Sequence, residues 1–200
     1  MENKSNELTG NDPEVVASLR PDPSPEFKIN KTELTGFLKG HLNPEYLVVF
    51  SFGLDESRKM VLFVDIKDQK GTVIKPAEMI QSGSTDLAKP VNEAERKKSY
   101  IDSLGGLPGK RNGLCYWLTT GSKSHPGFYD FLVKHPGEQL YIYTGEGKIE
   151  GQTGIYRKLY FSFHDKISFA AEETLYNRGG ACCPPQAPPP PPPDPPGGDD

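Results

Sequence analysis

The chain has 200 residues, 34% of them hydrophobic, and a formal net charge of −4 at pH 7. Its basic and acidic side chains nearly balance over residues 26–178, which argues against strong binding to a nucleic-acid backbone, because that requires clustered lysine and arginine. No apolar run approaches the ~18 residues of a membrane-spanning helix, and the N-terminus lacks the apolar stretch of a secretory signal. We therefore expect a cytoplasmic protein whose three cysteines are reduced thiols.

The composition divides the chain into three parts. Residues 1–25 are polar and interrupted by prolines, which predicts a disordered arm, with a short docked helical turn at Val15, Val16 and Leu19 as the alternative. Residues 26–178 have the apolar content of a single globular domain, long enough to bury a core without a disulfide or a metal. Residues 179–200 carry almost no apolar bulk and predict a disordered proline-rich tail.

Hydrophobic periodicity predicts the elements of the domain in chain order. Apolar residues at helical spacing, β-branched and aromatic runs, and Gly or Pro breaks give the assignment. The predicted elements are a helix over 31–42, strands over Tyr46–Leu54 and 59–67, a short strand near 71–75, a helix over 91–104, a strand over 114–119, a helix over 126–135, a hairpin of 139–144 with 155–164, and a final strand or short helix over 167–175.

Hairpins at both ends of this order, with helices between them, predict an α+β fold. We expect a mixed, largely antiparallel sheet with about three helices. Asp65 interrupts the apolar run of the second strand, and the alternation of strand side chains places it on the more solvated face of the sheet.

A glycine-rich stretch over 105–113 contains Gly109-Lys110-Arg111. A phosphate-binding loop needs Ser or Thr after the lysine, and it must lead from a strand into a helix rather than the reverse. We interpret the stretch as a connection, with Lys110 and Arg111 as a candidate anion site. The four histidines show no metal-ligand spacing, so we expect no metal and no cofactor.

Cys115 is the main candidate for catalysis. It stands in an apolar strand beside Trp117, and a fold that brought it to His125 or His164 would create a nucleophilic pair. A cysteine in such a strand otherwise behaves as a small buried hydrophobe. No serine nucleophile motif and no carboxylate pair stands out, so we favour a protein without catalysis and keep a small enzyme at Cys115 as the alternative.

The closing hairpin predicts a tyrosine-rich face. Strand alternation turns Leu140 and Ile142 to the core and leaves one face with Tyr141, Tyr143, Tyr156, Lys158, Tyr160 and His164. Tyrosines on a solvated sheet can stack on a base, a sugar or a partner's side chain. Alternatively, a helix covers this face, or cross-strand tyrosine pairs only stabilise the sheet.

The tail contains six consecutive prolines, Pro188–Pro193, which form an extended polyproline II helix. Such a segment is either a ligand for aromatic-lined grooves of a protein partner or a spacer. Cys182 and Cys183 stand at its root, open to lipidation, to an intermolecular disulfide or to a soft metal.

These patterns favour a binding module for a protein or a small ligand, acting through the tyrosine face or the proline tail. The alternatives are the small enzyme at Cys115 and a weak binder of single-stranded nucleic acid on the tyrosines. No motif is specific enough to assign a family.

Overall fold

The computed structural model describes residues 7–9, 13–19, 23–104, 115–121, 127–148, 155–167, 174–176 and 179–180. Within these ranges the elements in chain order are β1 (Glu7–Thr9), α1 (Pro13–Ser18), β2 (Phe27–Asn30), α2 (Lys31–Leu38), β3 (Tyr46–Leu54), β4 (Met60–Asp68), β5 (Val73–Gln81), α3 (Glu93–Ser103), β6 (Cys115–Thr119), α4 (Phe128–Lys134), β7 (Gln139–Lys148), β8 (Ile155–Ser162), β9 (Thr174–Tyr176) and β10 (Gly179–Gly180).

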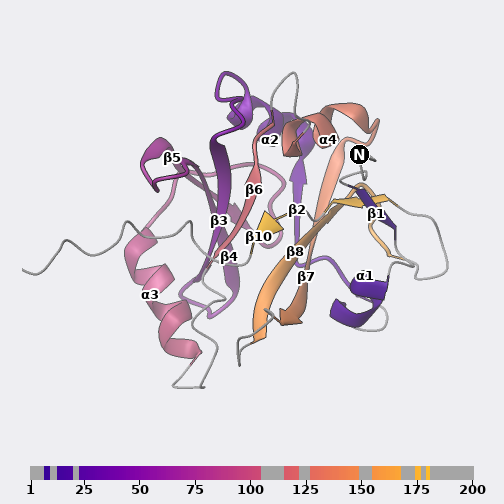
Figure 1. The fold of residues 1–200 in the computed structure, drawn as a ribbon. Coiled ribbons are helices and arrows are strands. Elements are labelled where there is room, and N and C mark those ends of the chain that lie inside the picture. The colour runs from indigo at the N-terminus through magenta and orange to yellow at the C-terminus, as the bar shows by residue number, and fades with distance from the viewer. Residues whose placement is uncertain are drawn as a thin grey trace, which may run out of the picture.

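The strands form two five-stranded antiparallel sheets (Figure 1). Sheet A has the order β1-β9-β8-β7-β2, and sheet B has the order β10-β6-β3-β4-β5. The α+β class is confirmed, but the strands divide between two sheets where the sequence pattern suggested one. None of the helices in the described ranges is long and apolar enough to cross a membrane.

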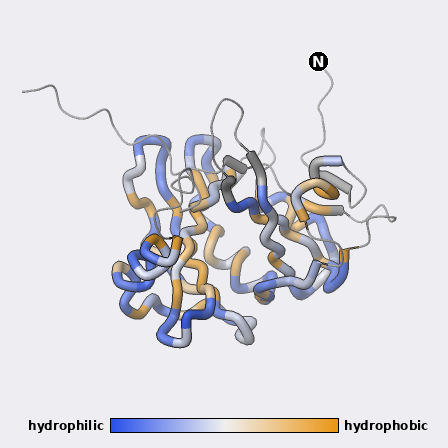
Figure 2. Tube along the Cα trace, turned by 90° about the horizontal axis from the view of Figure 1, so that it is seen from below, coloured by the Kyte–Doolittle hydropathy of each residue, from blue (hydrophilic) through white to orange (hydrophobic). Residues whose placement is uncertain are grey.

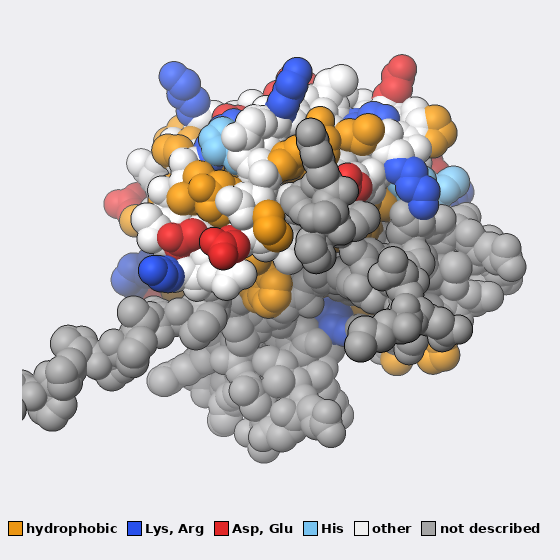
Figure 3. All heavy atoms as spheres, turned by 45° about the horizontal axis from the view of Figure 1, so that its top comes forward, with side chains coloured by type: hydrophobic (Ala, Val, Ile, Leu, Met, Phe, Trp, Pro, Cys, Tyr) orange, Lys and Arg blue, Asp and Glu red, His pale blue; other side chains and the backbone are white. Residues whose placement is uncertain are grey.

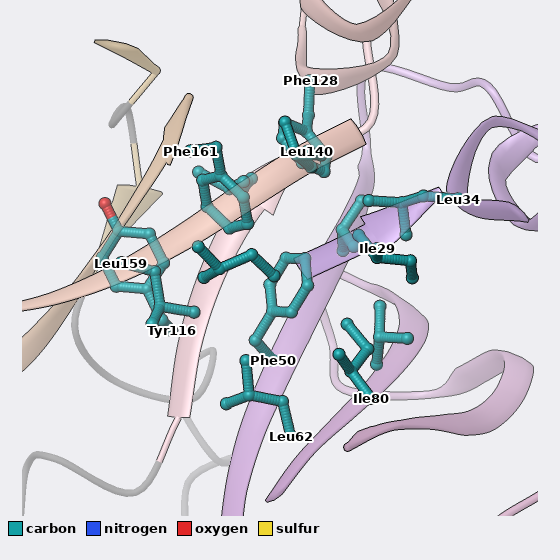
Figure 4. Close-up of a cluster of buried hydrophobic side chains, with 14 of the residues drawn as sticks. Ile29, Leu34, Phe50, Leu62, Ile80, Tyr116, Phe128, Leu140, Leu159 and Phe161 are labelled. Atoms are coloured by element: carbon teal, nitrogen blue, oxygen red, sulfur yellow. The ribbon is translucent and has the colours of Figure 1, made fainter. Parts of the chain in front are cut away.

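The two sheets share one hydrophobic core. Alternate residues of the central strands turn inward, and α2 and α4 add their buried sides at one end of the sheets (Figures 1 and 4). Apolar residues follow the strands, whereas polar residues gather in the peripheral segments (Figure 2). The buried residues at the centre of this core include Ile29, Leu34, Phe50, Leu62, Ile80, Tyr116, Phe128, Leu140, Leu159 and Phe161.

Part of the predicted arm is folded. Residues 13–18 form α1, and its Val15, together with Leu19, is buried in a second cluster on the outer side of sheet A. The helical turn that the sequence offered as an alternative therefore describes this segment, although Val16 is exposed. Val15 and Leu19 are four residues apart, so they lie on the same side of the helical segment. Both pack on an apolar surface of sheet A, which is enough to dock this short helix.

Several element boundaries differ from the predicted ones for local reasons. Helix α2 ends at Leu38 rather than at 42, because Gly40 adopts a left-handed backbone with φ of +87°. Strand β5 continues to Gln81, where the pattern predicted only a short strand, and it lies at the edge of sheet B, where Pro76 is tolerated. The short strands β1, β2, β9 and β10 carry too few residues for a period to be visible.

Asp65 is not on a solvated face, as its sequence position suggested. It is 4% exposed in β4, and its Oδ2 atom lies 3.4 Å from Lys67 Nζ, whereas Oδ1 has no hydrogen-bond partner among the described residues. Burial raises the pKa of the Asp65 carboxyl above its ordinary value, although the ammonium groups of Lys67 and Lys97 work against the rise. The outer face of sheet B is buried here, and strand periodicity alone could not show that.

We expect Asp65→Asn to be more stable than the native chain at pH 7. A raised pKa means that the folded chain retains the proton at pH values where the unfolded chain has lost it, so ionised Asp65 costs stability above that window. The amide keeps the shape and removes the buried charge. The melting temperature should rise by about 2–4 °C for each kcal/mol recovered.

The same variant should lose its advantage as the pH falls below the ordinary pKa of aspartate, because Asp65 is then protonated in both states. Melting temperatures of the native chain and the Asp65→Asn variant are measured between pH 3 and pH 8. Lys67→Met, which removes the partner of the ion pair, is measured as a control. A variant that melts below the native chain at pH 7 would show that the pairing with Lys67 outweighs the burial of the charge.

Candidate functional site

The predicted tyrosine face is covered by α1. Tyr143 and Tyr160 are fully buried, and they pack with Val15 and Leu19 in the outer cluster, against which the half-buried Tyr141 also lies. The predicted alternation is present, since the opposite residues of both strands lie in the main core. In this structure the two central tyrosines are therefore closed to a base or to a partner's side chain.

Two other members of the predicted face are less buried than Tyr143 and Tyr160. Lys158 is half-buried and His164 is exposed at the end of the hairpin, while Tyr143 donates a hydrogen bond from its hydroxyl to the His164 carbonyl at 2.8 Å. The side chain of Tyr156 lies outside the described residues. Among the described side chains on the face shown in Figure 3, acidic and basic groups are interspersed with apolar ones and form no single charged patch.

Cys115 does not offer a nucleophile. It is 1% exposed in a cluster with Leu47 and Val49, and it is disulfide-bonded, which corrects the expectation of a reduced thiol. A sulfur held in a disulfide has no thiolate to attack a substrate. His125, the closer histidine in sequence, lies outside the described residues.

The remaining candidates fall largely on residues that the structure does not describe. Lys110, Arg111, Cys182, Cys183 and the run Pro188–Pro193 all lie outside the described ranges. Among the residues that are described, no three His, Cys, Asp or Glu side chains are grouped so as to hold a metal ion.

A cavity that sequence reasoning missed lies between α1 and the open end of sheet A. Its volume is about 680 Å³, within the usual range for a ligand site. We call it the β7-edge pocket, and its lining comprises Ala17, Ser18, Leu19, Pro23, Ser24, Pro25, Glu26, Thr144, Gly145, Glu146 and Arg157.

The pocket exists because β2 is shorter than its neighbour β7. Strand β2 pairs only with Gln139–Ile142, and one further bond runs from the Glu26 N–H to the Ile142 carbonyl at 2.9 Å. Proline at position 25 has no N–H, so the ladder cannot continue through it. The second half of β7 therefore extends beyond β2 along the pocket.

The backbone of this half of β7 faces the pocket. Alternate residues of a strand direct their N–H and C=O groups to the same side. Since the Ile142 carbonyl points toward β2, the backbone groups of Thr144 and Glu146 point to that side as well. They form an edge to which another strand can be added.

Polar side chains surround this edge. The Thr144 hydroxyl donates a hydrogen bond to Glu26 Oε1 at 2.7 Å, which orients the carboxylate. The second oxygen, Glu26 Oε2, and the Ser18 hydroxyl are buried without a hydrogen-bond partner among the described residues. Gly145 permits the close approach of α1, because a Cβ there would stand 2.5 Å from Ser18 Oγ.

Among the described lining residues, Arg157 supplies the one basic group, and its guanidinium packs near an aromatic ring of α3. It is opposite Glu146 in the β7–β8 register, and its guanidinium lies 5.9 Å from the centre of the Tyr100 ring of α3. Burial raises the pKa of the Tyr100 hydroxyl, and the charge of Arg157 opposes that rise. The lining residues that the structure describes thus include two carboxylates and one guanidinium.

One signal in the sequence pointed toward this site. Pro23-Ser24-Pro25-Glu26 directly precedes the first apolar strand residues, which places an acidic group where a strand must begin. The partner strand and its length could not be read from that signal.

The chain matches no protein-family model, no curated protein and no solved structure. The fold defines an α+β protein built from two antiparallel sheets.

Proposed function

We propose that this protein is a binding module without catalysis, and that it binds a short extended peptide segment carrying a basic side chain. The observation that carries the proposal is the strand edge of Thr144 and Glu146, which faces a cavity of about 680 Å³. An extended peptide added to a sheet edge gains affinity from main-chain hydrogen bonds and specificity from pockets for alternate side chains.

The charge of the pocket sets the class of side chain. In the described part of the lining, Glu26 and Glu146 outnumber Arg157, and the Glu26 carboxylate has a buried oxygen without a partner among the described residues. A lysine or arginine of the peptide would satisfy that oxygen with a charge-assisted hydrogen bond. An acidic side chain would add to the excess of negative charge and is disfavoured.

A matched pair of variants tests the role of the backbone edge. Glu146→Pro removes the Glu146 N–H on the pocket side without touching the β8 ladder, whereas Glu146→Ala removes only the exposed side chain. Peptides selected from a displayed random library against the full chain are then titrated by fluorescence anisotropy. We expect Glu146→Pro to weaken binding about tenfold beyond Glu146→Ala, as the loss of one hydrogen bond implies.

Glu26→Gln tests the charge preference separately. Peptides with a central lysine or arginine should lose affinity for this variant, while their norleucine analogues should bind the native chain and the variant alike. Selection of peptides without a basic residue, or equal binding to Glu146→Pro and Glu146→Ala, would contradict the proposal. A chain ending after Ala187 should keep full affinity, which separates this site from any partner of the proline run.

We propose a cytoplasmic location for the protein, but the disulfide at Cys115 argues for an oxidising environment, where such bonds persist. Fractionation of cells expressing the native chain, followed by alkylation of free thiols in each fraction, decides between the two. A disulfide-bonded chain found only outside the cytoplasmic fraction would overturn the proposed location.

A further inference from the structure

The open edge of β7 fixes the position of each residue in an added strand, an inference that rests on the proposed function. Every described strand pair in sheet A is antiparallel, and an added strand in the same direction continues the line of β2. Its last paired residue would be opposite Thr144, because the Glu26 N–H already occupies the Ile142 carbonyl. The preceding residue would then be opposite Gly145, and the one before that opposite Glu146.

The residue opposite Thr144 would project to the core side of sheet A. Residues directly opposite each other in an antiparallel pair share one face, and Thr144 is itself opposite Leu159 of the main core. The Glu26 carboxylate is held on this side, since it accepts the hydrogen bond from the Thr144 hydroxyl at 2.7 Å. A basic side chain at this position of the peptide is therefore the one that reaches the unpartnered Glu26 Oε2.

The preceding residue of the peptide would project to the opposite side, where α1 lies. Strand alternation gives it the face of Gly145. A Cβ on Gly145 would be 2.5 Å from Ser18 Oγ and 3.1 Å from the Ser18 carbonyl oxygen, so the last residue of α1 lies directly against this face of β7. The Cβ of the peptide residue would be only about 4.5–5.5 Å from the Gly145 Cβ position, which brings a long side chain up against α1.

We propose that the β7-edge pocket selects a small residue (glycine, alanine or serine) directly before the basic residue of its peptide, and that Ser18 sets this limit. The basic residue binds Glu26 on one side of the added strand, and the small residue passes beside the end of α1 on the other. The position opposite Glu146 is less restricted, since it shares the core side of the strand with the Glu146 carboxylate and the Arg157 guanidinium.

A larger side chain beside Ser18 is accommodated only if α1 is displaced. Val15 and Leu19 of this segment are buried against Tyr143 and Tyr160, so moving it exposes apolar surface to water. Forcing extra atoms into such a closed site is expected to weaken binding about tenfold or more.

A peptide series tests this limit on the full chain. The probe is the tightest lysine peptide from the displayed library, labelled with fluorescein, with glycine, alanine, serine, leucine or phenylalanine directly before the lysine. We expect the first three to agree within about threefold, and leucine and phenylalanine to bind about tenfold or more weakly in anisotropy titrations. Leucine two residues before the lysine, opposite Glu146, should cost less than about threefold. Equal binding of all five peptides, or an equal loss from leucine at both positions, would overturn the proposal.

Ser18→Gly and Val16→Gly form a matched pair of variants. Both place glycine in α1, but Ser18 lines the pocket, whereas Val16 is 46% exposed and does not belong to the described lining. We expect Ser18→Gly to narrow the difference in affinity between the leucine and alanine peptides by about threefold or more, and Val16→Gly to leave it unchanged. An unchanged difference in Ser18→Gly, or the same narrowing in Val16→Gly, would show that Ser18 sets no limit.

Glu146→Pro separates a failure of this proposal from a failure of the proposed function. If Glu146→Pro binds the lysine peptide more weakly than Glu146→Ala, and yet all five residues are accepted before the lysine, the pocket binds peptides without the selection by Ser18. If the library yields no peptide with lysine or arginine, or if Glu146→Pro and Glu146→Ala bind alike, the proposed function is wrong and this proposal is wrong with it.

Discussion

Replacing Phe128 by alanine is expected to lower the free energy of unfolding by about 3–5 kcal/mol, the usual cost of removing a buried aromatic side chain. Phe128 is fully buried at the first position of α4. Its ring centre lies 4.7 Å from that of Phe161 in sheet A and 6.1 Å from that of Phe50 in sheet B. One side chain therefore joins a helix to both sheets, and the cavity left by alanine would open at their junction.

Thermal melts and urea titrations measure this effect. A loss of this size corresponds to a fall in melting temperature of about 6–20 °C for a domain of 150–250 residues. Val133→Ala is the matched control, since Val133 lies on the same helix but is 56% exposed, and its substitution should change stability by less than about 0.5 kcal/mol. A loss below about 1 kcal/mol for Phe128→Ala would mean that the core does not close around this ring.

Alanine at Gly127 is expected to be the most damaging substitution outside the core. An added Cβ would stand 2.5 Å from the Gly121 Cα and 2.8 Å from the Thr119 carbonyl oxygen, both of which are backbone atoms. Backbone cannot turn aside as a flexible side chain can, so α4 must move away from the end of β6. Such overpacking typically costs about 1–3 kcal/mol, and movement of α4 would add to it.

The same region shows why α4 must approach so closely. The Gly127 N–H donates a hydrogen bond to Asp130 Oδ2 at 2.7 Å, and the Tyr129 N–H donates to the Thr120 carbonyl at 3.2 Å. The first bond closes the start of α4 on itself, and the second connects α4 to the residue that follows β6, so a displaced helix would lose the second bond.

Gly36→Ala provides the control for Gly127→Ala. Gly36 lies within α2, and an added Cβ there would meet no atom within 4 Å. Alanine at this position should stabilise the protein by about 0.5–1 kcal/mol, because glycine is costly in a helix interior. Opposite signs for the two substitutions in denaturant titrations are the expected result. A Gly127→Ala protein as stable as the native chain would show that α4 can shift freely.

Runs of β-branched and aromatic residues predicted the central strands well. The bounds of β3 agree with the predicted Tyr46–Leu54, and α4 lies within the predicted helix over 126–135. The division of the closing hairpin into a core face and a tyrosine face is also present. These elements depend on local periodicity, which a single sequence displays directly.

The candidate sites depended on what covers each element, and the sequence could not show this. A tyrosine side chain has an apolar ring and a polar hydroxyl. The same run of tyrosines is therefore compatible with a solvated surface and with a covered one. Two valines and a leucine in an otherwise polar arm were the only sign that α1 would cover Tyr143 and Tyr160. The buried Asp65 is a second case, since a charged residue in a strand normally marks a solvated face.

By itself, the sequence determined the α+β class, the main strands and helices, and the near-neutral charge, because these follow from composition and from periods of two and 3.6 residues. The tertiary structure decided that two sheets share the core, that β7 extends beyond β2 to leave an open edge, and that β10 pairs with β6. Each of these is a pairing between segments far apart in the chain. Such pairings are selected by the burial and register of the whole fold, which local periodicity does not encode.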